Sequence, residues 1–449
     1  MKFHRPLRLT ALAAFTGLVL GCGSSSTPAP TLAPTGPVFS ILRANLFGTD
    51  QQANGPSTSG ESLSSNGRFL VFSSSATNLV DNDTNGFQDC FVRDTFTGVT
   101  SRVSLDSSNA QGDGDSTTPR ISADGRFVVF TSSATNLVAG DTNAMPDVFL
   151  RDLTNGVTTR ISVDSAEAEA NGGSSAISIS SDGRFVAFFS TATNLVPGDN
   201  NGFIDVFLRD TLNGTTTRVS LDSQGNEGNG DSFAGVASDD GRFVAFYSEA
   251  SNLVAGDANN ASDIFLKDLQ DGSIQLVSVS STNQQSNGGC SPSIDMTFDG
   301  RFVSFTGAGT NLVPDDNNGL ADVFVRDVVG QTTVRASLTN EGAETTDIGS
   351  FAPKISANGR YVVFSSGSDQ LVLEDTNGVE DIFLRDLLGA TTARLNVSQD
   401  GVQANGLSEH PGISADGRFV MFGSEATNLV PNDTNGVRDI FQSRNPAEP

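Results

Sequence analysis

One segment recurs from end to end of this 449-residue chain and determines what it can fold into. The anchor of the repeat is Asp/Asn-Gly-Arg-Phe/Tyr. Its aromatic residue occurs seven times, 58 or 59 residues apart, at Phe69, Phe127, Phe185, Phe243, Phe302, Tyr361 and Phe419. So regular a period indicates a row of similar supersecondary units. The unit is too long for a helical-pair or leucine-rich solenoid, and it suits a four-stranded β-propeller blade with two long loops.

Four strands are predicted in each unit, and the second unit illustrates them at 120–123, 126–131, 147–153 and 157–164. Asp124-Gly125 is a hairpin-turn dipeptide between the first two strands. The second and third strands are apolar on both faces, as expected for strands covered by neighbouring blades. The fourth strand alternates between apolar and polar residues, which is typical of a half-exposed outer strand. We expect Arg160 to protect the open edge of this strand from pairing with another sheet.

The order of strands and loops predicts a closed ring with two unlike faces. Residues 134–146 and 165–176 form long loops that should emerge on one face, while the tight turns emerge on the other. The last unit stops after its third strand, 439–443, and a matching fourth strand occurs at 39–46. The N-terminal strand is therefore predicted to complete the seventh blade, which leaves no open sheet edge. The sequence predicts an all-β, seven-bladed propeller over residues 38–445.

The repeat resembles a known family of propeller repeats. The segments Ser-x-Asp-Gly-Arg-Phe-Val-x-Phe and Asp-Val-Phe-Leu-Arg-Asp are similar to the TolB-like, WD-repeat-like β-propeller repeats of bacterial envelope proteins. The resemblance covers roughly residues 38–443 and implies a propeller fold. It carries little information about function, because such repeats serve as scaffolds in many proteins.

The N-terminal residues 1–21 have the pattern of a secretion signal. Three basic residues precede a short apolar run, 9–20, which is too short to span a bilayer comfortably. Val19-Leu20-Gly21-Cys22 resembles the lipobox of bacterial lipoproteins, which implies cleavage before Cys22 and lipid attachment to it. The alternative is an ordinary signal peptide with a chance cysteine. Residues 22–37, rich in Gly, Ser, Thr and Pro, have the composition of a flexible tether.

The composition fits an exported protein anchored in the bacterial envelope, on the outer membrane or its periplasmic side. The chain has 26 Lys and Arg against 52 Asp and Glu, a net charge of −26. Removing residues 1–21 takes away three basic residues and leaves 23 against 52, or about −29. So acidic a domain should repel nucleic acid and anionic lipid headgroups and should attract cations. We expect contact with the membrane only through the lipid anchor.

A second motif, Asp-x-Asn-x-x-x-Asp, occurs once per unit in the loop between strands two and three. Closely spaced oxygen side chains on a turning backbone suit a hard cation, so these loops are candidate Ca²⁺ sites. The alternative is turn chemistry, in which Asp and Asn bond their own backbone amides. The candidate ligands are Asp83, Asn85, Asp89, Asp141, Asn143, Asp147, Asp199, Asn201, Asp205, Asp257, Asn259, Asp263, Asp316, Asn318, Asp322, Asp375, Asn377, Asp381, Asp433, Asn435 and Asp439.

Catalytic machinery is hard to assemble from this sequence. Of two histidines, His4 lies in the signal and His410 is expected on the loop-rich face, where a solvated side chain is the simplest interpretation. Cys90 and Cys290 are expected to be free thiols, since they lie in distant units. Paired carboxylates on the loops leave a carbohydrate- or peptide-cleaving enzyme open. The absence of Trp lowers that possibility, because sugar sites usually need flat aromatic platforms.

Departures from the repeat are further candidates for a site. They are Tyr247, Glu249, Glu425, residues 367–370 and the pair Asp295-Met296, where the chain before Phe302 is lengthened. The Arg-Asp pairs that end each third strand, such as Arg151-Asp152, are instead expected to form exposed ion pairs on the tight-turn face, each contributing about 0–1 kcal/mol.

These observations favour a non-enzymatic, lipid-anchored scaffold that binds an envelope protein or another extracytoplasmic ligand, as a monomer and with Ca²⁺ as a possible stabilising ion. The alternative is an envelope hydrolase or lyase that acts through acidic residues on carbohydrate or peptide.

Overall fold

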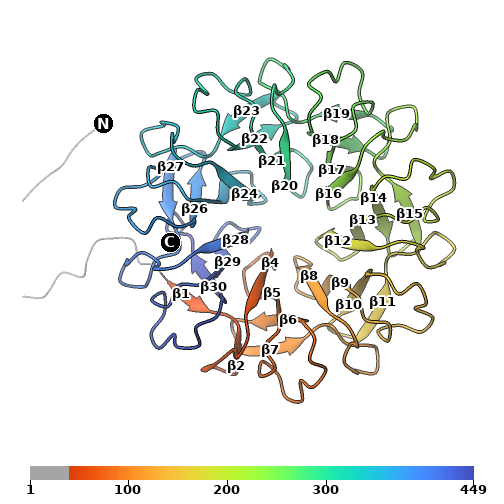
Figure 1. Cartoon of the computed structure of the whole chain (residues 1–449), viewed down its shortest axis with the longest axis vertical. Helices are drawn as coiled ribbons and strands as arrows, with labels where there is room; N and C mark the ends of the chain where they lie inside the picture. Colours follow the sequence, from red (N-terminus) through yellow and green to blue (C-terminus); the bar gives the residue numbers. More distant parts are fainter. Residues whose placement is uncertain (1–39, 449) are drawn as a thin grey trace, which may run out of the picture. The chain divides into compact units, whose positions relative to one another are not determined.

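The computed structural model describes residues 40–448, which consist of β-strands and connecting loops. The predicted signal peptide, the lipidation residue Cys22 and the tether all lie outside the described residues. Within the described part, no helix has the length and apolarity needed to cross a membrane. Seven four-stranded antiparallel sheets are arranged as the blades of a propeller around a central axis (Figure 1). The prediction of an all-β, seven-bladed propeller is confirmed.

Each blade runs from an inner strand at the axis to an outer strand at the rim. The first three blades are β4 (Ser57–Leu63), β5 (Phe69–Ser74), β6 (Asp89–Asp94) and β7 (Val99–Arg102); β8 (Ser116–Ile121), β9 (Phe127–Ser132), β10 (Asp147–Asp152) and β11 (Val157–Arg160); and β12 (Ser174–Ile179), β13 (Phe185–Ser190), β14 (Asp205–Asp210) and β15 (Thr215–Arg218). Blades four and five are β16 (Ser232–Ala237), β17 (Phe243–Ser248), β18 (Asp263–Asp268) and β19 (Ile274–Leu276); and β20 (Cys290–Met296), β21 (Phe302–Gly307), β22 (Asp322–Asp327) and β23 (Thr332–Arg335). Blade six is β24 (Ser350–Ile355), β25 (Tyr361–Ser366), β26 (Asp381–Asp386) and β27 (Thr391–Arg394).

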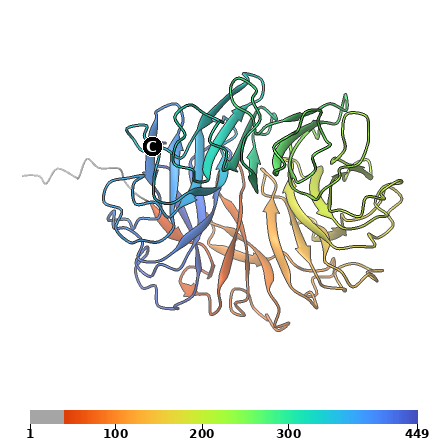
Figure 2. The ribbon, with the colours of Figure 1, turned by 45° about the horizontal axis from the view of Figure 1, so that its top comes forward.

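Blade seven joins the two ends of the described chain. It contains β28 (Ser408–Ile413), β29 (Phe419–Ser424) and β30 (Asp439–Arg444), and its fourth strand is β1 (Ile41–Arg43). β1 pairs antiparallel with β30, so that Arg43 lies opposite Phe441. In Figure 2 the first, red strand lies beside the blue strands of the last blade. The predicted closure of the ring is confirmed. A short hairpin of β2 (Leu46–Phe47) and β3 (Gln51–Gln52) follows β1.

The apolar core lies between adjacent blades rather than in one central mass. Within each blade, a phenylalanine of the second strand stacks on one of the third strand, with ring centroids 5.6–5.9 Å apart, as for Phe130 and Phe149. These cross-strand pairs face the neighbouring blade, where Phe130 packs with Val71 and Cys90. This explains why the second and third strands are apolar on both faces.

The tight-turn face is held together by the anchor tetrapeptide. Gly125 has a φ of +77°, and a Cβ atom there would lie 2.3 Å from the ring of Phe69 in the preceding blade. Arg126 stacks over Phe127 at 4.5 Å and pairs with Asp152 at 2.6 Å. The expected rim ion pair therefore uses the anchor arginine. The prediction for Arg151 was wrong: it is buried, and it donates to the Asp106 carbonyl of the preceding blade at 2.7 Å.

The predicted strand bounds shift most at the inner and outer strands. The inner strand β8 begins at Ser116, earlier than predicted, because a bulge with a positive φ at Thr118 hides the alternation of side chains. The outer strand β11 ends at Arg160, and the residues after it already belong to the loop that leads to the next blade.

Candidate functional site

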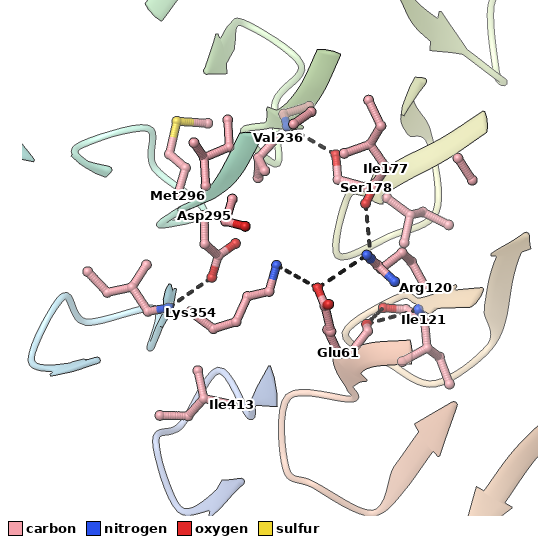
Figure 3. Close-up of a pocket in the computed structure, with 18 of the residues that line it drawn as sticks. Glu61, Arg120, Ile121, Ile177, Ser178, Val236, Asp295, Met296, Lys354 and Ile413 are labelled. Atoms are coloured by element: carbon pink, nitrogen blue, oxygen red, sulfur yellow. Dashed lines mark hydrogen bonds and ion pairs between the residues drawn. The ribbon is translucent and has the colours of Figure 1, made fainter. Parts of the chain in front are cut away.

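A cavity of about 670 Å³ lies on the axis of the ring and is lined by the inner strands. Its walls are partly apolar, through Ile121, Ile177, Val236, Met296 and Ile413 among others. Charged side chains from four different blades also face it, namely Glu61, Arg120, Asp295 and Lys354 (Figure 3). A concave, mostly apolar pocket with a few convergent charged groups is the usual form of a binding site.

One position of the inner strands varies widely from blade to blade. We call the penultimate residues of these strands the channel ring; they are Ser62, Arg120, Ser178, Val236, Asp295, Lys354 and Gly412. The second and third strands repeat nearly the same residue types in every blade, but the channel ring contains two cations, one anion, two hydroxyl groups, one apolar side chain and one glycine. Repetition is what a shared fold requires, so the variation in the channel ring points to a role beyond folding.

Three members of the channel ring each accept a backbone N–H from the inner strand of the next blade. Ser62 Oγ accepts a hydrogen bond from the backbone N–H of Ile121 at 3.1 Å. Ser178 Oγ accepts one from Ala237 at 3.2 Å. In the same way, Asp295 Oδ2 accepts the backbone N–H of Ile355 at 2.9 Å. The bonds connect blade one to two, three to four, and five to six.

Glu61 is the centre of a charged network in the cavity. Its carboxylate lies 3.1 Å from Lys354 Nζ, 3.4 Å from Arg120 Nη2 and 3.1 Å from His410 Nδ1. Burial by itself would raise the pKa of Glu61, but Lys354, His410 and Arg120 together hold that pKa well below its usual range. Glu61 therefore stays ionised and links blades one, two, six and seven.

Asp295 is the second carboxylate of the cavity, and the sequence had marked it as a departure from the repeat. Burial raises its pKa above the ordinary value, although the nearby charge of Lys354 acts in the opposite direction. Figure 3 shows the carboxylate turned towards the channel, with its hydrogen bond to the backbone of the next inner strand. The cavity thus contains one firmly ionised carboxylate and one that protonates more readily.

The predicted location of His410 was wrong, because it lies in a strand and not on a loop, although its side chain is 43% exposed. It is in the inner strand β28, at a bulge with φ of +55°, and lines the cavity. Its hydrogen bond with Glu61 is the main cause of a pKa raised above the usual value, and burial opposes that effect. The sequence did not predict this strand, because Ser408-Glu409-His410-Pro411 lacks the alternation of apolar and polar residues and contains a proline, as turns often do.

The Asp-x-Asn loops form a second type of site, repeated around the outer part of the ring. In six blades the two aspartates of the motif flank an arginine of the fourth strand. The nearest nitrogen–oxygen distances are 2.8 Å for Arg102–Asp83, 3.2 Å for Arg160–Asp147, 3.1 Å for Arg218–Asp199, 3.0 Å for Arg335–Asp322, 3.1 Å for Arg394–Asp375 and 2.8 Å for Arg43–Asp433. A guanidinium group therefore lies where the sequence indicated a metal ion.

The asparagine of the motif has a different role from the aspartates. In blade three, Asn201 Nδ2 donates to Asp205 at 3.1 Å, while Asn201 Oδ1 accepts the backbone N–H of Phe203 at 3.0 Å. The amide oxygen is thus used to cap the turn, as in the turn-chemistry alternative. The amide donation to the last aspartate is found in all seven blades.

The expectation that Arg160 protects a strand edge was wrong, because this arginine is one of those that lie between the loop aspartates. Its side chain is only 9% exposed and lies within ion-pair distance of Asp141, Asp147 and Glu169. These three acidic groups are close enough to form a metal-binding cluster, but Arg160 already supplies a cation there. The strand alternation indicated the face on which Arg160 lies, and only the fold brings the three acids to that face.

The other departures from the repeat lie outside this cavity. Tyr247 Oη donates to Glu249 at 3.2 Å, and Glu425 pairs with Arg438 at 3.2 Å. At 367–370, Ser368 Oγ donates to Asp347 at 2.7 Å. These contacts explain the substitutions as local exchanges of polar partners.

Comparison with known proteins gives the fold but no family membership. No family model matches the chain, and no curated protein does. Among solved structures, oligogalacturonate lyase from Vibrio parahaemolyticus is 13% identical, with a TM-score of 0.53 over 90% of this chain and 96% of that one. A second oligogalacturonate lyase structure, 14% identical with the same TM-score of 0.53 and the same coverage of 90% and 96%, is in complex with manganese.

Two further solved structures are similar to this chain. The β-propeller domain of the Trilobed protease from Pyrococcus furiosus is 12% identical, with a TM-score of 0.51 over 85% of this chain and 93% of that one. TolB from Acinetobacter baumannii is 16% identical, with a TM-score of 0.38 over 68% of this chain and 58% of that one. Likeness at this level shows the propeller fold alone.

Proposed function

We propose that this chain is an exported, lipid-anchored propeller that binds an envelope ligand in its central cavity. The observation that carries the proposal is the channel ring, where the residues vary from blade to blade while the second and third strands repeat. Half-buried charges such as Glu61 and Asp295 are costly to place in a protein, and clusters of groups with shifted pKa values are typical of functional sites.

The chemistry of the cavity indicates the kind of ligand. Arg120 and Lys354 offer partners for an anionic group, and Asp295 offers one for a cationic group or a hydrogen-bond donor. Apolar residues such as Ile177 and Val236 lie between them. A segment of an envelope protein that carries charged and apolar side chains fits this mixture best. Its charged groups would replace the internal contacts of Glu61.

The test is a binding measurement with a matched pair of variants. The full chain, purified in detergent, is cross-linked to envelope proteins of its own host through a photoreactive residue at Val236. The double variant Glu61→Gln/Lys354→Gln should reduce the specific cross-link at least tenfold. Arg126→Gln/Asp152→Asn removes an ion pair of the same charges on the tight-turn rim and should leave it unchanged. Equal cross-linking in both variants would rule out the cavity as the binding site.

The proposed anchor has its own test. Cys22→Ser should move the protein from the membrane fraction to the soluble extracytoplasmic fraction and abolish incorporation of labelled fatty acid. Retention of the variant in the membrane fraction, with label still incorporated, would contradict lipidation at this residue.

A second candidate function is an envelope hydrolase or lyase. The observation that favours it is the pair of carboxylates with opposite pKa shifts, Asp295 raised and Glu61 lowered, together with His410 in the same cavity. Groups with separated pKa values can divide the roles of general acid and base. Assay against oligosaccharide and peptide panels tests this, and turnover that is lost in Asp295→Asn would support the enzyme over the scaffold.

A further inference from the structure

Blade four lacks the arginine that the other six blades place between their loop aspartates. In blade three, Arg218 pairs with Phe207 across the outer two strands. The equivalent pair in blade four is Leu276 with Phe265, so a leucine takes the position of the arginine. The side chain of Leu276 packs against the apolar cluster between blades three and four. Leu276 therefore occupies the strand position of the arginine but cannot neutralise the negative charge of the loop aspartates.

The two aspartates of blade four are nevertheless present, and Asp257 is half-buried. Asp263 is fully buried, and burial raises its pKa above the usual value. Gln285 Nε2 donates to Asp257 Oδ1 at 2.7 Å and to Asp263 Oδ2 at 2.9 Å. Asn259 also donates to Asp263, at 2.9 Å. Among the described residues, neither aspartate has an ion-pair partner. Two carboxylates thus share neutral donors only.

One oxygen of this group has no partner at all. Asp257 Oδ2 is buried and accepts no hydrogen bond within the described structure. Asp83, Asp141 and Asp316 also bury an oxygen without a hydrogen bond. Those oxygens, however, have an arginine nitrogen nearby, at 2.8 Å from Asp83, 3.7 Å from Asp141 and 3.3 Å from Asp316. The unpartnered oxygen of Asp257, in contrast, has no cation beside it among the described residues.

We propose that blade four binds one Ca²⁺ ion between Asp257 and Asp263, in the place of the missing guanidinium group. The atoms available as metal ligands are all oxygens, which is the ligand type that Ca²⁺ prefers. Besides the two carboxylates, they include the carbonyl of Gly256. Its counterpart in blade three, the Gly198 carbonyl, accepts from Arg218 at 3.4 Å. Rotation of the Gln285 amide would turn its oxygen towards the ion, and water would complete the coordination.

Charge balance distinguishes this site from the other loops. A divalent ion neutralises Asp257 and Asp263, whereas the arginines of the other blades already compensate their aspartates. The Ca²⁺ sites considered from the sequence in all seven loops thereby reduce to one. The site lies on the outer side of the ring and does not depend on a ligand in the cavity.

The test is calorimetric titration of the full chain, freed of metal with a chelator, with CaCl₂. We expect about one bound ion per chain and a higher thermal midpoint in Ca²⁺ than in chelator. MgCl₂ at the same concentration should have a much smaller effect, because Mg²⁺ demands a stricter octahedral geometry. No heat and no shift in the thermal midpoint, or binding of several ions, would overturn the proposal.

Two reciprocal variants make the test specific. Leu276→Arg restores the guanidinium group, so Ca²⁺ should no longer bind, and the variant in chelator should be at least as stable as the wild type in Ca²⁺. Arg218→Leu removes the cation of blade three, leaving Asp199, Asp205 and Glu227, and should create a second Ca²⁺ site. If Leu276→Arg does not fold, Asp257→Asn provides the same information and should weaken Ca²⁺ binding at least tenfold. Ca²⁺ binding that persists in Leu276→Arg or Asp257→Asn would place the ion elsewhere.

Discussion

Arg43 Nη2 lies 2.8 Å from Asp433 Oδ2, and this pair joins the first strand of the propeller to its last loop. Both side chains are almost completely buried, at 4% and 3% exposure. The bond of Asn45 Nδ2 to Asp439 at 2.7 Å closes the same seam. Ring closure therefore rests on buried polar contacts as well as on the pairing of β1 with β30.

Arg43→Leu should destabilise the propeller strongly, because it leaves Asp433 and Asp439 buried without a cation. Removing one partner of a buried ion pair typically costs about 3–5 kcal/mol. Arg126→Leu removes an exposed pair on the rim and should cost about 1 kcal/mol or less. Urea unfolding of both variants measures the difference. Similar losses of stability would mean that closure does not depend on Arg43.

Gly125→Ala and Gly140→Ala separate the effect of backbone conformation from that of close packing. Both glycines have a positive φ, +77° and +78°, which costs about 1–2 kcal/mol for a residue with a Cβ. At Gly140 there is open space, whereas at Gly125 the new Cβ would clash with the ring of Phe69. Gly125→Ala should be worse by a further ~1–3 kcal/mol in urea unfolding. Equal effects would show that the ring of Phe69 can move aside without cost.

Stability should pass through a maximum in mildly acidic solution. Burial raises the pKa of Asp141 and of Asp375 to about 6, from an ordinary value of 3.8. A carboxyl with a raised folded-state pKa binds its proton more readily when folded, so stability increases as the pH falls through 6 towards 4. The pKa of Asp210 is lowered to about 2, mainly by its hydrogen bond with Arg184, and that contribution is lost as the pH falls below 3.8.

The thermal midpoint, measured between pH 3 and pH 8 at constant ionic strength, checks this prediction. Asp141→Asn/Asp375→Asn should flatten the change of the thermal midpoint between pH 4 and 7. Asp210→Asn should alter the thermal midpoint only below about pH 4. A midpoint that rises steadily from pH 4 to 7 would contradict the raised pKa values.

The thiols of Cys90 and Cys290 should be unreactive in the folded protein. Both side chains are buried and unpaired, and burial raises the pKa of each thiol above its usual value. Titration with a thiol reagent at neutral pH should therefore find no reactive group before unfolding in guanidinium chloride and two afterwards. The chain has three cysteines, so a third reactive thiol after unfolding would show that Cys22 carries no lipid on its sulfur. Rapid reaction in the folded state would contradict the burial of Cys90 and Cys290.

The ring, its number of blades and its closure could be predicted, because the same strand and turn pattern recurs in every unit of the sequence. Phe69 and its six equivalents mark the period, and the strand at 39–46 matches the fourth strands of other units. Contacts between residues that are distant within one unit, such as Arg160 and Asp147, could not be predicted from the sequence. They depend on the register between strands, which the alternation of residues does not fix.

The cavity was the least predictable part of the molecule. Glu61, Arg120, Lys354 and His410 come from four blades, and no local motif connects them. Asp295 was the exception, since the lengthened chain before Phe302 marked it as unusual. Leu276 gave an equally clear signal, a leucine where six blades have arginine, but its meaning depends on knowing that the arginine lies between the two loop aspartates.

The bonds of Ser62, Ser178 and Asp295 join blades in pairs, and seven is an odd number. Blade seven has Gly412 in the channel ring and therefore no such bond to offer. A Cβ on Gly412 would lie 2.6 Å from the backbone of Glu61, so this glycine leaves room for the strand of blade one. This one kind of bond therefore couples six blades and leaves out the seventh, which is joined to blade one by the contact of His410 with Glu61 instead. Amide hydrogen exchange between β28 and β4 should accordingly become faster when that contact is lost, as in His410→Ala.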